Sequence, residues 1–294
     1  MVTVHSERRP KSKMNWKKHY TRKANRMEEQ ANKELLSLTN DYVFRRIFGQ
    51  KNLSALAVFL AIILGMTVEE LGDLHVDDPH MHRERKKGKS NVLDIRVHTN
   101  SGEIINVEIQ VNPEKGFRER LAYLNSKAFS GQLDRGTPYW MLNRTITIVV
   151  ATFDLIEENR DCLNRFQWYN IKDGTMLTDA QEIDVLELSK LPQENDGSEL
   201  WKWLRFFKSG REDEMEELAK DNDEMKKVMV TLREMSADEY ERRLAEQLEK
   251  DERDRLGQIE YGRQEGEARA KQETAQRMRE KGYSEDEIAD LIGN

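Results

Sequence analysis

Cysteine and proline are scarce in this 294-residue sequence, which has one cysteine, Cys162, and five prolines. A single thiol excludes the intrachain disulfide framework of small secreted proteins and suits a reducing compartment. The basic N-terminal residues are not followed by the hydrophobic segment of a signal peptide, so we expect a cytoplasmic protein. The sequence also has no glycine-rich phosphate loop and no recognisable Ser-His-Asp pattern, which leaves those two classes of enzyme without support.

Long hydrophobic runs are missing as well. The apolar run 56–66, LAVFLAIILGM, covers about half of the ~20 residues that a membrane-spanning helix needs. The run therefore predicts a buried helix of a folded domain, and we expect no membrane partner.

Charge is abundant but unevenly distributed: 35% of the residues are charged, 37% are hydrophobic, and the formal net charge is −7. The acidic balance argues mildly against a protein that coats nucleic acid. We expect three regions, namely a basic tail over 1–35, a folded core over 36–210 and a charged helical region over 211–294. The tail suits salt-dependent contact with a polyanion, and the alternative is a mobile tail without a ligand.

The stretch 92–111, VLDIRVHTNSGEIINVEIQV, reads as two alternating strands joined at Asn100–Gly102, with glycine where the turn needs a positive φ. Alternation places branched aliphatic side chains on one face and polar side chains on the other. The polar face carries Asp94, Arg96, His98, Asn106, Glu108 and Gln110. Counting back from a three-residue loop pairs Asp94 with Glu108.

Such a pairing places two carboxylates side by side, because cross-strand neighbours have Cβ atoms about 4.5 to 5.5 Å apart. At about 5 Å and an effective dielectric constant near 20, their repulsion is on the order of 3 kcal/mol. Two compensations remain open. A divalent cation could lie between Asp94 and Glu108, or Arg96 could neutralise them on a solvent-exposed, salt-bridged face.

Asp94, Glu108 and Gln110 follow an order that resembles the PD-(D/E)xK nuclease signature, with Gln in place of the usual Lys. Further motifs occur in a fixed order around them, including TNDYVFRRIFG at 39–49, RERLAYLNSKAFSGQL at 118–133 and a Gly-x-x-Tyr at 136–139. Together they resemble the Rpn family of recombination-promoting nucleases, also described as PD-(D/E)xK family transposases. The resemblance runs from about Leu36 to the C-terminus.

The resemblance implies an α/β fold, with a mixed sheet flanked by helices in a restriction-endonuclease-like core and a helical C-terminal region. Periodicity places the strands at 71–76, in the two arms of the 92–111 hairpin, and at 145–152, 165–170 and 183–188. Helices are expected over 39–49, 53–64 and 114–133, and in an aromatic segment around 201–207.

The resemblance also implies a Mg²⁺ site, with Mn²⁺ as an alternative ion. Asp94 and Glu108 would bind the ion together with the backbone carbonyl of Ile109. Asp41 is a further candidate ligand, although a carboxylate in the first turn of a helix has a structural role of its own. Gln110 would orient water or phosphate, because a neutral amide cannot supply the charge of the lysine that it replaces.

DNA contacts are expected near the start of the 114–133 helix, from Arg118, Arg120 and Tyr123. The basic loop that precedes the hairpin supplies further candidates, Arg85, Lys86, Lys87 and Lys89. An arginine fork suits bidentate phosphate binding, and the alternative for each arginine is an ordinary exposed side chain.

We therefore expect a Mg²⁺-dependent DNA endonuclease linked to DNA recombination or mobile elements. A rival hypothesis is a catalytically inert, nuclease-like scaffold that binds nucleic acid or a protein partner, because Gln110 departs from the common motif. A third is a helical protein that forms a homo-oligomer through the C-terminal helices.

Overall fold

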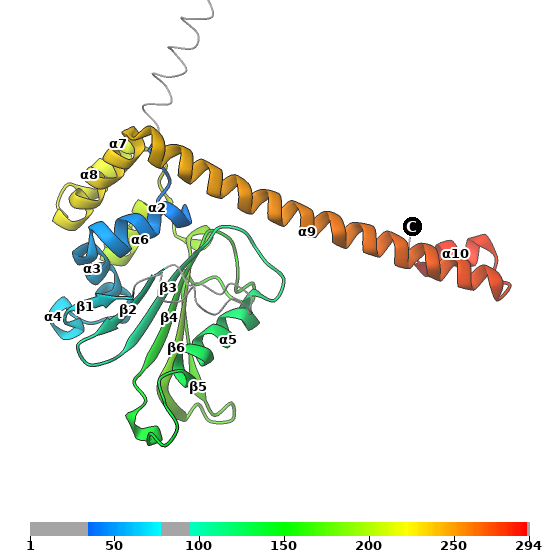
Figure 1. Cartoon of the computed structure of the whole chain (residues 1–294), viewed down its shortest axis with the longest axis horizontal. Helices are drawn as coiled ribbons and strands as arrows, with labels where there is room; N and C mark the ends of the chain where they lie inside the picture. Colours follow the sequence, from blue (N-terminus) through cyan, green and yellow to red (C-terminus); the bar gives the residue numbers. More distant parts are fainter. Residues whose placement is uncertain (1–34, 78–94, 293–294) are drawn as a thin grey trace, which may run out of the picture. The chain divides into compact units, whose positions relative to one another are not determined.

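The computed structural model describes residues 35–77 and 95–292 (Figure 1). The described residues form two compact units, one ending at Glu239 and the other starting at Tyr240. The boundary that composition suggests, after residue 210, falls inside the first unit.

The first unit is built on a six-stranded sheet in the order β1-β2-β3-β4-β6-β5. The strands are β1 Leu74–Val76, β2 Ile95–Thr99, β3 Ile104–Gln110, β4 Thr145–Ala151, β5 Leu163–Tyr169 and β6 Met176–Glu187. β3 pairs with β4 and β4 with β6 in parallel, whereas the other three pairs are antiparallel. The mixed sheet expected from the sequence is therefore confirmed.

The β2–β3 hairpin has the predicted turn and register. Gly102 has a φ of 92°, which favours glycine, and the Thr99 N–H donates to the Glu103 carbonyl at 3.0 Å. Ile95 pairs with Val107 and Arg96 with Asn106, as counted from the sequence.

Helices cover both faces of the sheet. They are α2 Asp41–Arg46, α3 Leu53–Leu64, α4 Val68–Leu71, α5 Phe117–Ser130, α6 Glu199–Lys208, α7 Glu212–Ala219 and α8 Asp223–Ala237, with a π-helical segment at Ile47–Lys51 and short 3₁₀ turns at Tyr139–Met141 and Leu188–Lys190. On one face, α5 packs Phe117 and Leu121 against Val149 of β4 and Val185 of β6.

The opposite face is covered by α3 and by an aromatic cluster. Phe59 of α3 lies 4.9 Å from Phe207 of α6 between ring centroids, and Phe44 and Phe48 complete the contact from the N-terminal helices. Arg165 of β5 donates to the Ile63 carbonyl at 2.7 Å, which ties α3 to the sheet. The aromatic segment therefore packs against the core, as the sequence indicates.

The helices α7 and α8 belong to the same unit as the sheet. Seven α8 residues are buried, and Thr231 accepts a hydrogen bond from the Asn52 side chain at 2.9 Å. Further along, the Ser236 hydroxyl accepts from the Leu36 N–H at 2.9 Å. These contacts explain why the unit extends past residue 210: the charged residues of α7 and α8 cover only one side of each helix, and methionine, valine and leucine line the other.

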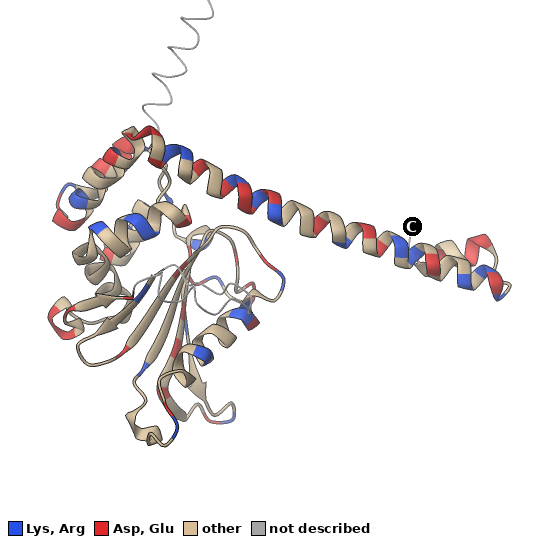
Figure 2. Cartoon of the chain, in the orientation of Figure 1, with Lys and Arg blue, Asp and Glu red and all other residues tan. Residues whose placement is uncertain are grey.

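The second unit contains most of the 42-residue helix α9, Glu239–Glu280, and the short helix α10, Glu285–Ile292. Acidic and basic side chains alternate along α9 (Figure 2), as in the Arg263 ion pairs with Glu260 and Glu267. Such i,i+3 and i,i+4 pairs support an exposed helix by a few tenths of a kcal/mol each.

No single helix among residues 35–77 and 95–292 is long and apolar enough to cross a membrane. One pair of consecutive helices, Asp41–Lys51 and Leu53–Leu64, passes on length and composition but is bent by 104°.

Candidate active site

Glu108 is the centre of the candidate site. It lies on β3, on the sheet face that α5 covers, and only 3% of its surface is exposed. Its Oε1 accepts a hydrogen bond from Arg120 Nη2 at 2.7 Å, whereas its buried Oε2 has no hydrogen-bond partner among the described residues. An unpaired buried oxygen costs about 1 to 3 kcal/mol, so a further ligand on Oε2 would be stabilising.

The surroundings of Glu108 disfavour its negative charge. The pKa of Glu108 is raised from 4.5 to about 7, chiefly by burial, and the negative charges of Asp41 and Glu114 contribute to this rise. Arg120 acts in the opposite direction and lowers it. Perturbed carboxylates of this kind occur at functional sites, and a divalent cation would favour the charged form.

Asp41 approaches this region from α2. The Asn40 side chain caps the helix by accepting from the Val43 N–H at 3.2 Å, which places Asp41 in the first turn. The Asp41 carboxylate is half exposed and pairs with Arg45 at 3.1 Å. The negative charge of Asp41 contributes to the raised pKa of Glu108.

Arg120 links two of the acids. It lies in the first turn of α5 and pairs with Glu108 at 2.7 Å and with Glu114 at 3.3 Å. Its guanidinium also lies over the Phe117 ring, 5.3 Å from the centroid. The sequence predicts phosphate binding for Arg120, whereas no sequence pattern distinguishes Glu114, an acidic residue beside Pro113.

The polar face of the hairpin is not a salt-bridged solvent surface. Asn106 and Glu108 are buried, and Arg96 donates to Asn106 at 2.8 Å and lies 4.0 Å from Asp77 instead of pairing with Glu108. The Arg96 alternative is therefore wrong for Glu108, because β3 is an interior strand whose polar side chains face α5.

Gln110 lies two residues beyond Glu108 and therefore on the same face of β3. It is 9% exposed, and its Nε2 donates to the Asn112 carbonyl at 2.7 Å. In this conformation the amide anchors the loop that follows β3. Ile109 points to the opposite face and is buried in the core.

The other two predicted DNA contacts on α5, Arg118 and Tyr123, contact residues other than Glu108 and Glu114. Arg118 donates to the Leu155 carbonyl at 2.9 Å and to Glu158 at 2.9 Å. Tyr123 is 56% exposed, with the Lys127 ammonium 5.7 Å from its ring centroid. Of the three predicted DNA contacts on α5, only Arg120 is bonded to Glu108.

Several predicted residues lie outside the described residues. They are the metal ligand Asp94 and the basic loop residues Arg85, Lys86, Lys87 and Lys89. Within residues 35–77 and 95–292, no group of three or more acidic, His or Cys side chains is placed to hold a metal ion.

The residues of the site nevertheless fit a hard divalent cation. Glu108 offers a buried, unpaired carboxylate oxygen, and the carboxylates of Asp41 and Glu114 act on it electrostatically. Mg²⁺ and Mn²⁺ are bound by such oxygen ligands.

A second group of buried acids is structural. Glu187 accepts from the Leu155 and Ile156 N–H groups at 2.6 and 2.9 Å and pairs with Lys190 at 3.0 Å. On the other face, Asp184 pairs with Arg165 at 3.0 Å, and burial raises the pKa of Asp184. In each of these two carboxylates both oxygens accept hydrogen bonds, whereas Glu108 Oε2 accepts none among the described residues.

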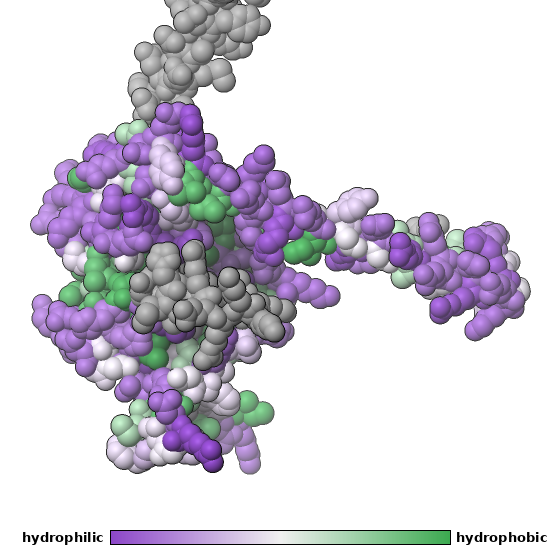
Figure 3. Space-filling model, in the orientation of Figure 1, coloured by the Kyte–Doolittle hydropathy of each residue, from purple (hydrophilic) through white to green (hydrophobic). Residues whose placement is uncertain are grey.

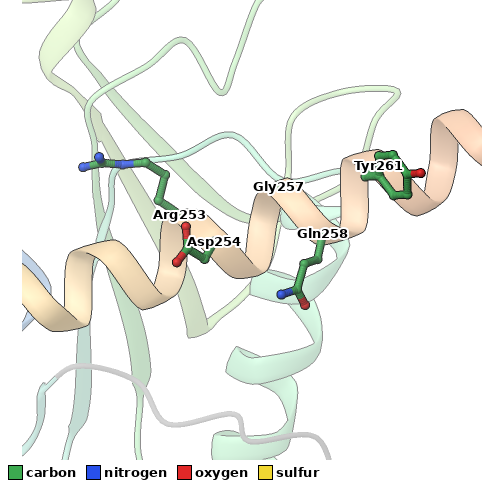
Figure 4. Close-up of a pocket in the computed structure, with 5 residues that line it drawn as sticks. All are labelled: Arg253, Asp254, Gly257, Gln258 and Tyr261. Carbon is green, nitrogen blue, oxygen red and sulfur yellow. The ribbon is translucent and has the colours of Figure 1, made fainter.

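Two surface features do not include the carboxylates of the site. Among the described residues, a depression on α9 is lined by residues of that helix alone, Arg253, Asp254, Gly257, Gln258 and Tyr261 (Figure 4), so it lacks the opposing wall of a binding pocket. The β5–β6 hairpin exposes Trp168, Tyr169 and Ile171. Figure 3 shows some hydrophobic surface at the end of the first unit where Figure 1 draws this hairpin.

Comparison with known proteins agrees with this architecture. No curated protein and no solved structure matched the sequence. The family described as PD-(D/E)XK nuclease family transposase matches residues 38–262. This range includes all six strands of the sheet, Glu108 and α5. By this match over most of its length, the chain belongs to the PD-(D/E)XK nuclease family transposases.

Proposed function

We propose that this protein is a divalent-cation-dependent DNA endonuclease that hydrolyses phosphodiester bonds in DNA recombination or in the movement of mobile elements. The observation that carries the proposal is the buried Glu108 carboxylate with its unpaired Oε2, in a chain that belongs to a nuclease family.

Glu108 and Asp94 would hold the cation, with the Ile109 carbonyl and Asp41 as further candidate ligands. Mg²⁺, or Mn²⁺ in its place, lowers the pKa of bound water and stabilises charge on a phosphate. The burial of Glu108 keeps bulk water away from one side of the carboxylate and strengthens its attraction for a cation.

The remaining residues would act on the substrate. Gln110, held at the Asn112 carbonyl, has an amide oxygen that can orient a water molecule. Arg120 is bonded to Glu108, and Tyr123 is exposed further along α5. Both are suited to phosphate and sugar contacts, and the basic residues Arg85, Lys86, Lys87 and Lys89 would add affinity without base specificity. Arg118 is a weaker candidate for phosphate contact, because its guanidinium is already bonded to Glu158.

The test combines cleavage of plasmid DNA with cation binding. Purified protein should nick supercoiled plasmid only with Mg²⁺ or Mn²⁺ present, and Asp94→Asn and Glu108→Gln should each abolish nicking. The same cation should raise the melting temperature of the parent but of neither variant. Nicking that survives in both variants would refute the assignment of these carboxylates.

One observation favours the second candidate, an inert nuclease-like scaffold that binds nucleic acid or a protein partner. Gln110 has no charge, and its amide N–H is bonded to the backbone of Asn112. A scaffold would bind DNA with the same affinity with and without the cation and would leave the plasmid intact in both conditions.

Self-association through the C-terminal helices stays a prediction. α9 is 42 residues long and exposes Ile259 and Tyr261 among its charged residues. The mass of the parent in solution, compared with that of a chain ending at Glu239, measures whether the second unit carries the contact.

A further inference from the structure

Arg120 forms an ion pair with Glu108, the carboxylate that would bind the cation. Its Nη2 lies 2.7 Å from Glu108 Oε1, and its Nη1 lies 3.3 Å from Glu114 Oε2. The Glu108 side chain is 4% exposed, whereas that of Arg120 is 32% exposed. The arginine thus reaches a buried acid from a position at the protein surface, from which it can leave without unfolding the core.

Arg120 stabilises the negative charge of Glu108, as a bound metal cation would. Asp41 and Glu114 act against the negative charge of Glu108, and Arg120 acts in its favour. When a divalent cation binds Glu108, a guanidinium at 2.7 Å from the same carboxylate is repelled, because like charges at such short range interact unfavourably. Cation and guanidinium therefore compete for one carboxylate.

Arg120 has a second anchor that does not compete. Glu114 pairs with it at 3.3 Å, and the Phe117 ring lies under the guanidinium at 5.3 Å. These two contacts can keep the side chain beside the site after Glu108 is released, with the N–H group that bonded Glu108 available to another acceptor. The acceptor expected in a nuclease is a phosphate oxygen, for which the planar fork of arginine is suited.

We propose that Arg120 is an exchangeable counter-ion: it pairs with Glu108 in the metal-free protein, is displaced by the divalent cation, and then binds the DNA phosphate beside the cation. The inference rests on the proposed function and adds an order of events to it. Because DNA phosphate draws Arg120 away from Glu108, cation and DNA strengthen each other's binding, and by linkage the two effects are equal.

The test is a calorimetric titration of the full chain with Mg²⁺, and separately with Mn²⁺, in the absence of DNA. The pH is kept well above the Glu108 pKa of about 7, so that protons do not compete with the cation. Arg120→Gln should bind the cation roughly tenfold more tightly than the parent, which corresponds to about 1.4 kcal/mol. Arg120→Lys, which restores a cation without the fork, should return the affinity towards that of the parent.

A matched control is present two turns later on the same helix. Lys127 is exposed, with its ammonium 5.7 Å from the Tyr123 ring centroid, so Lys127→Gln removes a positive charge from α5 and should leave the cation affinity unchanged. The dependence on DNA is measured with a short duplex whose cleavage is blocked by Ca²⁺ in place of Mg²⁺. Added duplex should tighten Ca²⁺ binding to the parent, and this coupling should be lost in Arg120→Gln.

The outcomes separate the two levels of the proposal. Unchanged or weaker cation binding in Arg120→Gln, with the parent binding normally, would show that Arg120 only orients Glu108, and the exchange would be refuted while the proposed function stands. A parent that binds none of the three ions would refute both. Circular dichroism verifies the folding of Arg120→Gln, and if it is unfolded, the smaller tightening expected of Arg120→Lys decides the question.

Discussion

Replacing Glu108 with glutamine should change how the stability of the metal-free protein depends on pH. Because the pKa of Glu108 is raised from 4.5 to about 7, the fold favours the neutral carboxyl over the carboxylate. Its contribution to stability is fully present below pH 4.5 and is lost as the pH rises to about 7. The difference between the two pKa values corresponds to about 3 kcal/mol. Glutamine is neutral throughout and should not show this loss.

The free energy of unfolding of Glu108→Gln, minus that of the parent, should therefore increase by about 3 kcal/mol between pH 4.5 and a pH above 7. For a unit of roughly 200 residues, this corresponds to roughly 6 to 12 °C in melting temperature. Any fixed cost of the new amide cancels, because it is the same at every pH.

The assay is urea denaturation followed by tryptophan fluorescence, with EDTA present so that no cation reaches the site. Trp203 is fully buried in the aromatic cluster and reports on unfolding of the first unit. Glu119→Gln is the control, because Glu119 is an exposed carboxylate on α5 and its substitution should reproduce the parent profile. A difference between Glu108→Gln and the parent that is constant with pH would refute the desolvation of Glu108.

Three further predictions follow from other parts of the chain. Gln110→Lys should preserve or raise plasmid cleavage, since a lysine ammonium can still donate to the Asn112 carbonyl and adds the charge of the common motif, whereas Gln110→Ala should lower cleavage and leave calorimetric cation binding in place. Limited proteolysis should cut near the Glu239–Tyr240 boundary and leave a folded fragment, and mass spectrometry showing a stable fragment that ends near residue 210 would contradict the contacts of α8. Deleting residues 1–26 should flatten the slope of log affinity for DNA against log salt, and an unchanged slope would remove the basic tail from the binding surface.

The sequence was sufficient for the sheet and the hairpin because their signals are local. Alternation at β2 and β3 and the Asn-Ser-Gly turn determine the register, and the β-branched run 145–151 could only be a buried strand. The resemblance to the family motifs predicts Glu108 as a ligand, and the structure shows that this residue is buried.

The rest depended on contacts between distant residues. The burial of Glu108 and its pairing with Arg120 require α5 to lie on that face of the sheet, which no local pattern specifies. Glu114 was missed for the same reason. The boundary expected after residue 210 differs from the division at Glu239 and Tyr240, because the many charged residues of α7 and α8 obscure the apolar side of each helix. On that side Met215, Met225 and Leu232 are buried, at 0 to 1% exposure. Charge density alone does not separate a free helix from one that packs by a single face.

The hydrogen bond between Leu36 and Ser236 joins residues 200 positions apart, and the bond between Asn52 and Thr231 joins residues 179 positions apart. A ribosome that adds about 5 to 20 residues per second needs roughly 10 to 40 s to cover such a distance. During that interval α3, which is buried on nearly every side in the finished fold, has emerged without α8 to cover it. The nascent chain is therefore expected to depend on chaperones that bind apolar helices, and a translation pause placed before residue 223 should lengthen that dependence.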